Sequence, residues 1–145
     1  MSQSHVVTPE QAQALLKEGA VYIDVRNQVE FEQAHPEGAY NVPLILHTDF
    51  GPRPNDDFVD IVKRHFPIDG KLVVGCATGV RSNKAVRALV DAGFVNVAHQ
   101  SAGFNGSRDA FGRKSPGWLD CKLPVETGQP AGRSYEELAG AREDG

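Results

Sequence analysis

Short apolar runs rich in β-branched residues alternate with amphipathic helical segments along this chain, and this alternation constrains the fold most strongly. Residues 21–25 (VYIDV), 71–76 (KLVVGC) and 94–98 (FVNVA) have the length and composition of buried strands. Parallel neighbours in a sheet need crossover connections, which are usually helices. The sequence therefore predicts an α/β domain with a central, mainly parallel sheet flanked by helices on both faces.

The predicted helices occupy segments next to these strands. In the first of them, Thr8 and Gln11 have the spacing of a capping box. In the other two, apolar residues recur at helical spacing. The helices are predicted over residues 8–19, 58–66 and 82–92.

The remaining segments give weaker signals. A short helix is predicted over 27–34 and a short strand over 39–43. Residues 44–57 (LILHTDFGPRPNDD) contain two prolines and a glycine, which favours an irregular loop. Residues 129–145 are polar, and we expect a loosely held tail with at most a short helix around 136–141.

Composition excludes several classes of protein. At 145 residues and a formal net charge of −4, the chain has the length of one domain and gives no reason to expect binding to nucleic acid or to a membrane. No segment approaches the roughly 18 apolar residues of a transmembrane helix. The first residues show neither a basic start nor an apolar signal stretch. Two cysteines are too few for a disulfide framework, so we expect a cytoplasmic protein.

The predicted strand at 71–76 ends on a cysteine that a tight loop follows. The sequence from 73 to 82 is VVGCATGVRS, so Cys76 lies at the carboxyl end of a strand and directly before a helix. Ligands bind at this place in open α/β sheets. A sharp turn at Gly79 lets consecutive amide N–H groups point at one spot, and the helix N-terminus adds about half a positive charge. Such a site favours a reactive thiolate; a cysteine that only fills space is the alternative.

Four motifs follow one another along the chain. They are YIDVRNQVEFEQAHPEGAYNVP at 22–43, CATGVRS at 76–82, DAGFVNVAHQSAGFNG at 91–106 and GWLDCKLP at 117–124. In this order they resemble the signatures of rhodanese-type sulfurtransferases. The resemblance implies a rhodanese-like three-layer domain over residues 6–128, followed by a polar C-terminal tail over 129–145. Residues 101–104 (SAGF) depart from the family's usual paired glycines, and 44–57 looks like an enlarged loop.

The resemblance also implies a reaction. Cys76 would take a sulfane sulfur from thiosulfate or from a persulfide donor, hold it as a persulfide, and pass it to a thiol or to cyanide. The loop amides would line an anion cradle, and the guanidinium of Arg81 would be available to bind an anionic donor. The implied substrate-binding residues are Ala77, Thr78, Gly79, Val80 and Arg81. Donor and acceptor would be small molecules or proteins, the protein a monomer or a homodimer, and no cofactor would be needed.

Two other functions remain open from the sequence. Cysteine-based phosphatases and arsenate reductases of related architecture have loops that resemble C-x5-R, whereas four residues separate Cys76 from Arg81 here. The shorter loop predicts a smaller cradle, which suits a sulfur atom better than a phosphate or an arsenate. Some rhodanese-like domains are non-catalytic binding modules, but these typically lose the cysteine that this chain retains.

The other conspicuous residues are expected to be structural. Asp24 and Arg26 are predicted to form a buried ion pair, because buried charges must be paired. His35 resembles a family histidine that supports the fold through hydrogen bonds. The histidines show no metal-ligand spacing, so we expect no metal. Trp118 and Phe104 are expected in the core or a pocket wall. Cys121 is expected to be a structural thiol, the alternative being that it resolves a Cys76 persulfide into a disulfide.

Overall fold

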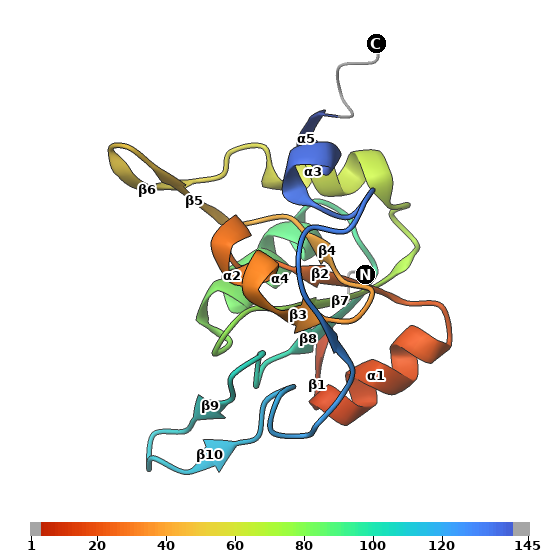
Figure 1. Ribbon diagram of the computed structural model, residues 1–145. Helices are drawn as coiled ribbons and strands as arrows, with labels where there is room; N and C mark the ends of the chain where they lie inside the picture. The colour runs from red at the N-terminus through yellow and green to blue at the C-terminus, as the bar shows by residue number, and fades with distance from the viewer. Residues whose placement is uncertain (1–3, 141–145) are drawn as a thin grey trace.

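The computed structural model describes residues 4–140, and its centre is a sheet of five parallel strands (Figure 1). In spatial order the strands are β1 (Ser4–Val7), β8 (Asn96–Gln100), β7 (Lys71–Gly75), β2 (Val21–Asp24) and β4 (Tyr40–Asn41). All four pairings between neighbours are parallel. The predicted α/β class with a parallel central sheet is therefore confirmed.

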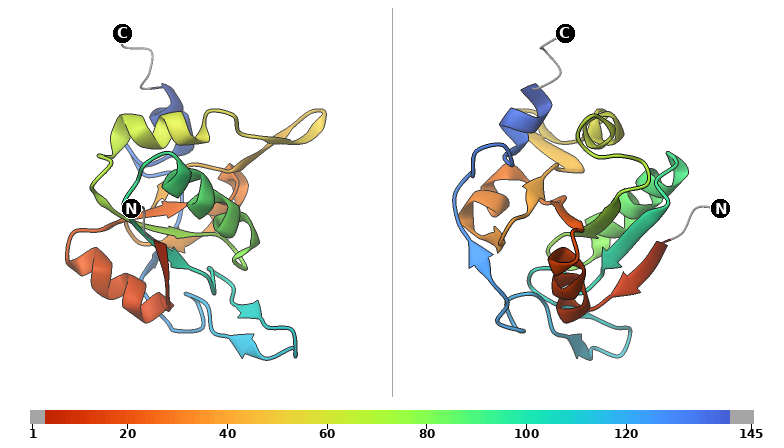
Figure 2. Two further views of the ribbon diagram at one scale, coloured as in Figure 1. Left: turned by 180° about the vertical axis from the view of Figure 1, so that it is seen from behind. Right: turned by 90° about the vertical axis from the view of Figure 1, so that its right-hand side faces the viewer.

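Five helices accompany the sheet in the described part of the chain. They are α1 (Pro9–Lys17), α2 (Gln28–Gln33), α3 (Phe58–His65), α4 (Val80–Asp91) and α5 (Tyr135–Gly140). The core divides into two clusters because neighbouring residues of a strand point to opposite faces. One cluster contains buried residues of α3, α4 and α5, and the other contains those of α1 and α2. Figure 2 shows the resulting three layers. Within residues 4–140, no helix is long and apolar enough to cross a membrane.

Local sequence signals fix where the first two helices begin. Thr8 caps α1 through a capping box with Gln11, as its spacing predicts. The sequence indicated only a short helix at α2, but Asn27 and Glu30 form the same reciprocal pair of hydrogen bonds there. Two orphan amide groups are satisfied in each box. The start of α2 is thereby fixed, and with it the position of Glu30.

The segment predicted as an irregular loop is instead a β-hairpin. Strands β5 (Ile45–Thr48) and β6 (Gly51–Pro54) pair antiparallel, and their turn places the Phe50 side chain in solvent. Its two prolines lie on β6, where they cost little because the hairpin pairs with no other strand of the described chain. The prediction of a loop was wrong because proline excludes a central strand but tolerates an edge.

Three small pairings extend the fold outside the central sheet. One is the β5–β6 hairpin. In the other two, β9 (Ser107–Arg108) pairs with β10 (Lys114–Ser115), and β3 (His35–Pro36) pairs with β11 (Val125–Glu126). The β3–β11 pair joins the C-terminal segment to the layer of α2. All three pairs are antiparallel.

The segment from 129 to 140 packs on the domain, contrary to the loosely held tail that we expected. Its helix α5 lies against α3 (Figure 1), and the Leu138 side chain is in the core cluster. The Arg133 guanidinium forms an ion pair with Glu126. Mainly through this contact, the pKa of Glu126 is lowered to about 2. Ala141, which the predicted helix included, lies outside the described residues.

A leucine substitution tests whether α5 contributes to stability. Leu138→Ala truncates a side chain that is only 3% exposed. We therefore expect the free energy of unfolding to fall by about 2–5 kcal/mol. Leu119→Ala is the matched control, because Leu119 is 47% exposed. Chemical denaturation of both variants measures the difference. A change as small for Leu138→Ala as for the control would mean that the tail is held loosely.

Candidate active site

The carboxyl ends of β2, β7 and β8 meet at one edge of the sheet. Their registers place Asp24 beside Gly75 and Gly75 beside Gln100. Cys76 follows directly after β7, which is the middle strand of the five. The predicted nucleophile therefore lies where parallel sheets bind ligands.

The loop from 76 to 82 wraps backbone N–H groups around the sulfur. The amide of Gly79 donates to Cys76 Sγ over 3.1 Å, and the amide of Ser82 donates over 3.3 Å. The helix α4 begins at Val80, so its N-terminus faces the same atom. Cys76 itself is only 2% exposed. The sulfur thus receives two backbone hydrogen bonds, which strengthen when the acceptor carries a negative charge.

Two glycines allow the loop to pack closely against the segment that follows β8. Gly79 has a φ of +97°, and a Cβ there would collide with the carbonyl oxygen of Ser101. Gly103 has a φ of +76°, and a Cβ there would collide with the backbone of Ala77. Only glycine adopts such φ values at little cost. The SAGF stretch therefore has a glycine, Gly103, at the position that touches the active-site loop.

Backbone hydrogen bonds fasten the two segments together. The amide of Phe104 donates to the carbonyl of Cys76 over 2.7 Å, and the amide of Asn105 donates to the carbonyl of Ala77 over 2.9 Å. Phe104 is buried, as expected for a pocket wall. The loop that carries Cys76 is thus held from behind by a segment more than twenty residues away in sequence.

A serine and a histidine extend from the sulfur into the protein. Cys76 Sγ lies 3.3 Å from Ser82 Oγ, and Ser82 Oγ lies 2.7 Å from His99 Nε2. Sequence reasoning gave neither side chain a role. The alternation of side chains along β8 could have placed His99 on the same face as Val97. Val97 packs in the core cluster that includes α4, so His99 faces that helix.

The sequence led us to expect a free guanidinium at Arg81, but in the structure this group is paired with Glu30. Its Nη1 and Nη2 donate to the two carboxylate oxygens of Glu30 over 2.7 and 3.1 Å. These hydrogen bonds raise the pKa of Arg81. Burial acts to raise the pKa of Glu30, but hydrogen bonds from Arg81 and from the Asn27 amide lower it below its ordinary value. An anionic ligand of Arg81 would have to share the guanidinium with Glu30.

The remaining predicted loop residues differ in their exposure. Ala77 is buried, Gly79 is half-buried, and Thr78 and Val80 are exposed. Residues 76–79 form the turn before α4, and Val80 is the first residue of that helix. The structure thus brings the predicted loop together, and places Arg81 at its end against α2.

The buried ion pair expected from the D-V-R motif is confirmed. Arg26 Nη2 lies 2.8 Å from Asp24 Oδ2, and the same nitrogen donates to the carbonyl of Ala34 over 2.6 Å. The guanidinium also lies over the Phe104 ring, 4.4 Å from its centroid. Arg26 therefore joins β2, α2 and the segment after β8 beside the Cys76 loop.

His35 supports the fold through hydrogen bonds, as predicted. Its Nδ1 lies 2.6 Å from the Phe31 carbonyl oxygen, and its Nε2 lies 3.1 Å from Glu126 Oε1. Both ring nitrogens thereby have partners in a fully buried position. This histidine connects α2 with β11 and stays outside the Cys76 loop.

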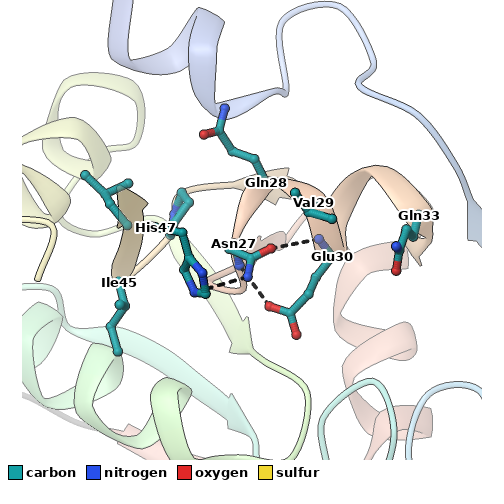
Figure 3. Close-up of a pocket in the computed structure, with 9 residues that line it drawn as sticks. Asn27, Gln28, Val29, Glu30, Gln33, Ile45 and His47 are labelled. Carbon is teal, nitrogen blue, oxygen red and sulfur yellow. Dashed lines mark hydrogen bonds between the residues drawn. The ribbon is translucent and has the colours of Figure 1, made fainter. Parts of the chain in front are cut away.

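A groove of about 470 Å³ lies between α2 and the β5–β6 hairpin. Figure 3 shows Asn27 and Glu30 from the start of α2 beside His47 from β5. The Asn27 side-chain nitrogen lies 3.4 Å from His47 Nε2. Because Glu30 also binds Arg81, its carboxylate connects this groove with the Cys76 loop. The enlarged stretch at 44–57 thus forms one wall of a groove next to the candidate site.

The second cysteine has a different environment. Cys121 is half-buried in a turn after Trp118, and both cysteines are free thiols. Burial first, and then the carboxylate of Glu10, raise the pKa of the Cys121 thiol. That environment disfavours a thiolate. Trp118 is fully buried, as expected for a core residue.

A metal centre has no basis in the described residues. Within 4–140, no group of three or more His, Cys, Asp and Glu side chains is placed to hold a metal ion. That the protein works without metal or cofactor stays a prediction.

Comparison with known proteins agrees with the geometry. The family described as Rhodanese-like domain matches residues 8–110. Thiosulfate sulfurtransferase 16, chloroplastic, from Arabidopsis thaliana is 40% identical over 94 residues, which cover 65% of this chain and 78% of that protein. Rhodanese-like domain-containing protein 17 from the same plant is 37% identical over 142 residues, or 95% of this chain and 83% of that protein.

Solved structures show the same fold. The crystal structure of Rv0390 from M. tuberculosis superposes with a TM-score of 0.71 at 26% identity. The match covers 88% of this chain and all of that one (100%).

The packing of Gly79 predicts a specific cost of substitution. Gly79→Ala adds both an unfavourable positive φ and a collision with the Ser101 carbonyl oxygen. Gly112→Ala is a matched control, because Gly112 has a φ of +80° but nothing within 4 Å of an added Cβ. We expect the control to lose about 1–2 kcal/mol of stability and Gly79→Ala to lose clearly more. Chemical denaturation measures both values, and equal losses would contradict the close approach.

Proposed function

Because the chain belongs to the rhodanese-like domain family, whose members include proteins named thiosulfate sulfurtransferase, we propose that it is itself a thiosulfate sulfurtransferase that carries sulfur on Cys76. The observation that carries this proposal is the position of the Cys76 sulfur, which two loop amides face at the N-terminus of α4. A thiolate is stabilised there by charge-assisted hydrogen bonds.

The reaction divides into two sulfur transfers. In the first, the Cys76 thiolate attacks the outer sulfur of thiosulfate. The S–S bond of thiosulfate breaks, sulfite leaves with its electron pair, and a Cys76 persulfide remains. In the second, an acceptor thiolate or cyanide attacks the terminal sulfur, and Cys76 leaves as a thiolate. Covalent catalysis of this kind splits one difficult transfer into two easier steps.

The loop supports both steps through its backbone. The persulfide's terminal sulfur carries negative charge, and the amides of residues 77 to 82 are the groups that would surround it. Backbone donors fixed before the reaction cost no reorganisation when charge develops. The firm attachment of the loop to residues 103–105 keeps those donors in place.

In this proposal, Arg81 and Glu30 together select the donor. Thiosulfate is a dianion, and the Arg81 guanidinium is its natural partner near Cys76. Glu30 already neutralises that guanidinium over 2.7 Å. A dianion therefore binds more weakly than it would to a free arginine. A persulfide donor carries less charge, so its affinity is reduced less. The acceptor is a thiol, either of a small molecule or of a protein.

The two alternative functions fit the site less well. A phosphatase or arsenate reductase would need a cradle for a tetrahedral anion, but only four residues separate Cys76 from Arg81. A non-catalytic binding module would not need a cysteine whose sulfur receives two amide hydrogen bonds. Both observations favour sulfur transfer.

Mass spectrometry tests the persulfide. After exposure to thiosulfate and removal of the excess, we expect the intact protein to gain one sulfur atom, located at Cys76. Steady-state kinetics with thiosulfate and cyanide should give parallel double-reciprocal lines, as a ping-pong mechanism requires. Cys121→Ser is the matched control and should stay within a few-fold of the parent. No mass gain, intersecting lines, or full activity in Cys76→Ser would overturn the proposal.

Substitutions at the ion pair test donor selection. Removing the charge-assisted contact in Arg81→Ala should weaken thiosulfate use by roughly 10- to 150-fold. Arg81→Lys should recover only part of this, because lysine lacks the planar fork. Glu30→Gln should lower the KM for thiosulfate, because it frees the guanidinium.

Kinetics over a range of thiosulfate concentrations measures these effects. If Arg81→Ala instead shifted the alkylation of Cys76 strongly to higher pH, with thiosulfate saturation hardly changed, Arg81 would tune the nucleophile. A higher KM in Glu30→Gln would show that the carboxylate positions Arg81 rather than competing with the donor.

A further inference from the structure

A chain of hydrogen bonds runs from the Cys76 thiol to the buried imidazole of His99. The distances are 3.3 Å from Cys76 Sγ to Ser82 Oγ and 2.7 Å from Ser82 Oγ to His99 Nε2. All three residues are buried, with exposed fractions of 2%, 0% and 8%. Ser82 lies in the first turn of α4 and His99 lies on β8, so a helix and a strand hold this series of hydrogen bonds in place.

With Cys76 as a thiol, the number of hydrogens fixes the directions of these hydrogen bonds. The Cys76 thiol donates to Ser82 Oγ. The hydroxyl of Ser82 has a single hydrogen, which then donates to His99 Nε2. In this arrangement Nε2 carries no hydrogen and the imidazole is neutral with its proton on Nδ1. The three groups are therefore ordered as donor, relay and acceptor.

The surroundings of His99 keep the imidazole neutral. On the neighbouring strands, its register partners are Val6 of β1 and Val74 of β7. On α4, the charged residues other than Arg81 are exposed, namely Lys84, Arg87 and Asp91. Burial lowers the pKa of His99 below its ordinary value. Burial by itself disfavours the imidazolium, so His99 takes up the proton only together with formation of the Cys76 thiolate, whose negative charge offsets this cost.

Two backbone amides and the Arg81 guanidinium lie near the Cys76 sulfur. Arg81 lies within electrostatic range of the thiol, and its positive charge attracts a negative charge on the sulfur. The Tyr22 hydroxyl also lies within electrostatic range, and burial raises its pKa, so it stays neutral. Gly79 and Ser82 donate their amides to the sulfur.

We propose that His99 is a positioning residue that accepts the Cys76 proton through Ser82. The Cys76 S–H bond breaks and its proton moves to Ser82 Oγ, while the Ser82 hydroxyl proton moves to His99 Nε2. The sulfur keeps the electron pair as a thiolate, and His99 becomes an imidazolium. No other reactant is needed, and the reverse transfer restores the thiol. The catalytic use of this thiolate rests on the proposed sulfurtransferase function, but its formation does not.

Alkylation of Cys76 by iodoacetamide over a range of pH tests the relay without any sulfur donor. His99→Gln keeps a polar group near Ser82 but cannot take up the proton, and Ser82→Ala removes the relay. We expect each variant to react about threefold to tenfold more slowly near pH 7, with its profile displaced to higher pH. The double variant should react no more slowly than the slower single variant, because both substitutions break the same chain.

Two controls complete this experiment. Both variants are studied in a Cys121→Ser background, so that only Cys76 reacts. His5→Gln is the matched histidine control, because His5 is exposed on the adjacent strand β1. It should leave the profile unchanged. Unchanged profiles in folded His99→Gln and Ser82→Ala would overturn the relay, while leaving the persulfide proposal to its own test.

A measurement on the unsubstituted relay covers the case in which those variants fail to fold. Nitrogen-15 NMR follows the titration of the His99 ring in the parent and in Cys76→Ala. The thiolate stabilises the imidazolium, so we expect His99 to titrate at lower pH once Cys76 is removed. Identical titrations in both proteins would show that the two groups exchange no proton and would overturn the proposal.

Discussion

The contact between the loop after β7 and the segment after β8 is the interaction on which the rest of the candidate site depends. It consists of backbone hydrogen bonds from Phe104 and Asn105 to the carbonyls of Cys76 and Ala77. Gly79 and Gly103 permit this approach, because neither position has room for a Cβ. A loop held at this many points keeps its amides aimed at one atom. Preorganised donors of this kind are effective because they do not have to reorient.

Electrostatic contacts then connect this loop to α2. The buried pair of Asp24 and Arg26 joins the sheet to the end of α2, and Glu30 reaches from α2 to Arg81. The position of Glu30 itself depends on the capping box that Asn27 begins. A helix of six residues thereby sets the charge beside the Cys76 loop. The groove on its other side, toward the β5–β6 hairpin, uses the same carboxylate.

Burial gives the two ends of the Cys76 relay different properties. His99 lies among apolar neighbours that disfavour its charged form, whereas the Cys76 sulfur receives amide hydrogen bonds that favour a negative charge. In the proposed relay, the Cys76 proton moves between these two buried groups through Ser82. Cys121 shows the contrast, because its surroundings disfavour the thiolate.

The sequence by itself determined four of the five central strands (β2, β4, β7 and β8), the parallel sheet and the position of Cys76 before a helix, whereas the edge strand β1 was not predicted. These features depend on local periodicity and on turn residues, which act between neighbours in sequence. Motif resemblance added the loop residues, and the pairing of Asp24 with Arg26 needed only a separation of two residues. Only the tertiary structure decided that Glu30 forms an ion pair with Arg81 and that His99 contacts Ser82. It also decided that residues 45–54 form a hairpin and that Leu138 is buried. Each of these depends on segments far apart in sequence, whose meeting is fixed by packing and not by any local pattern.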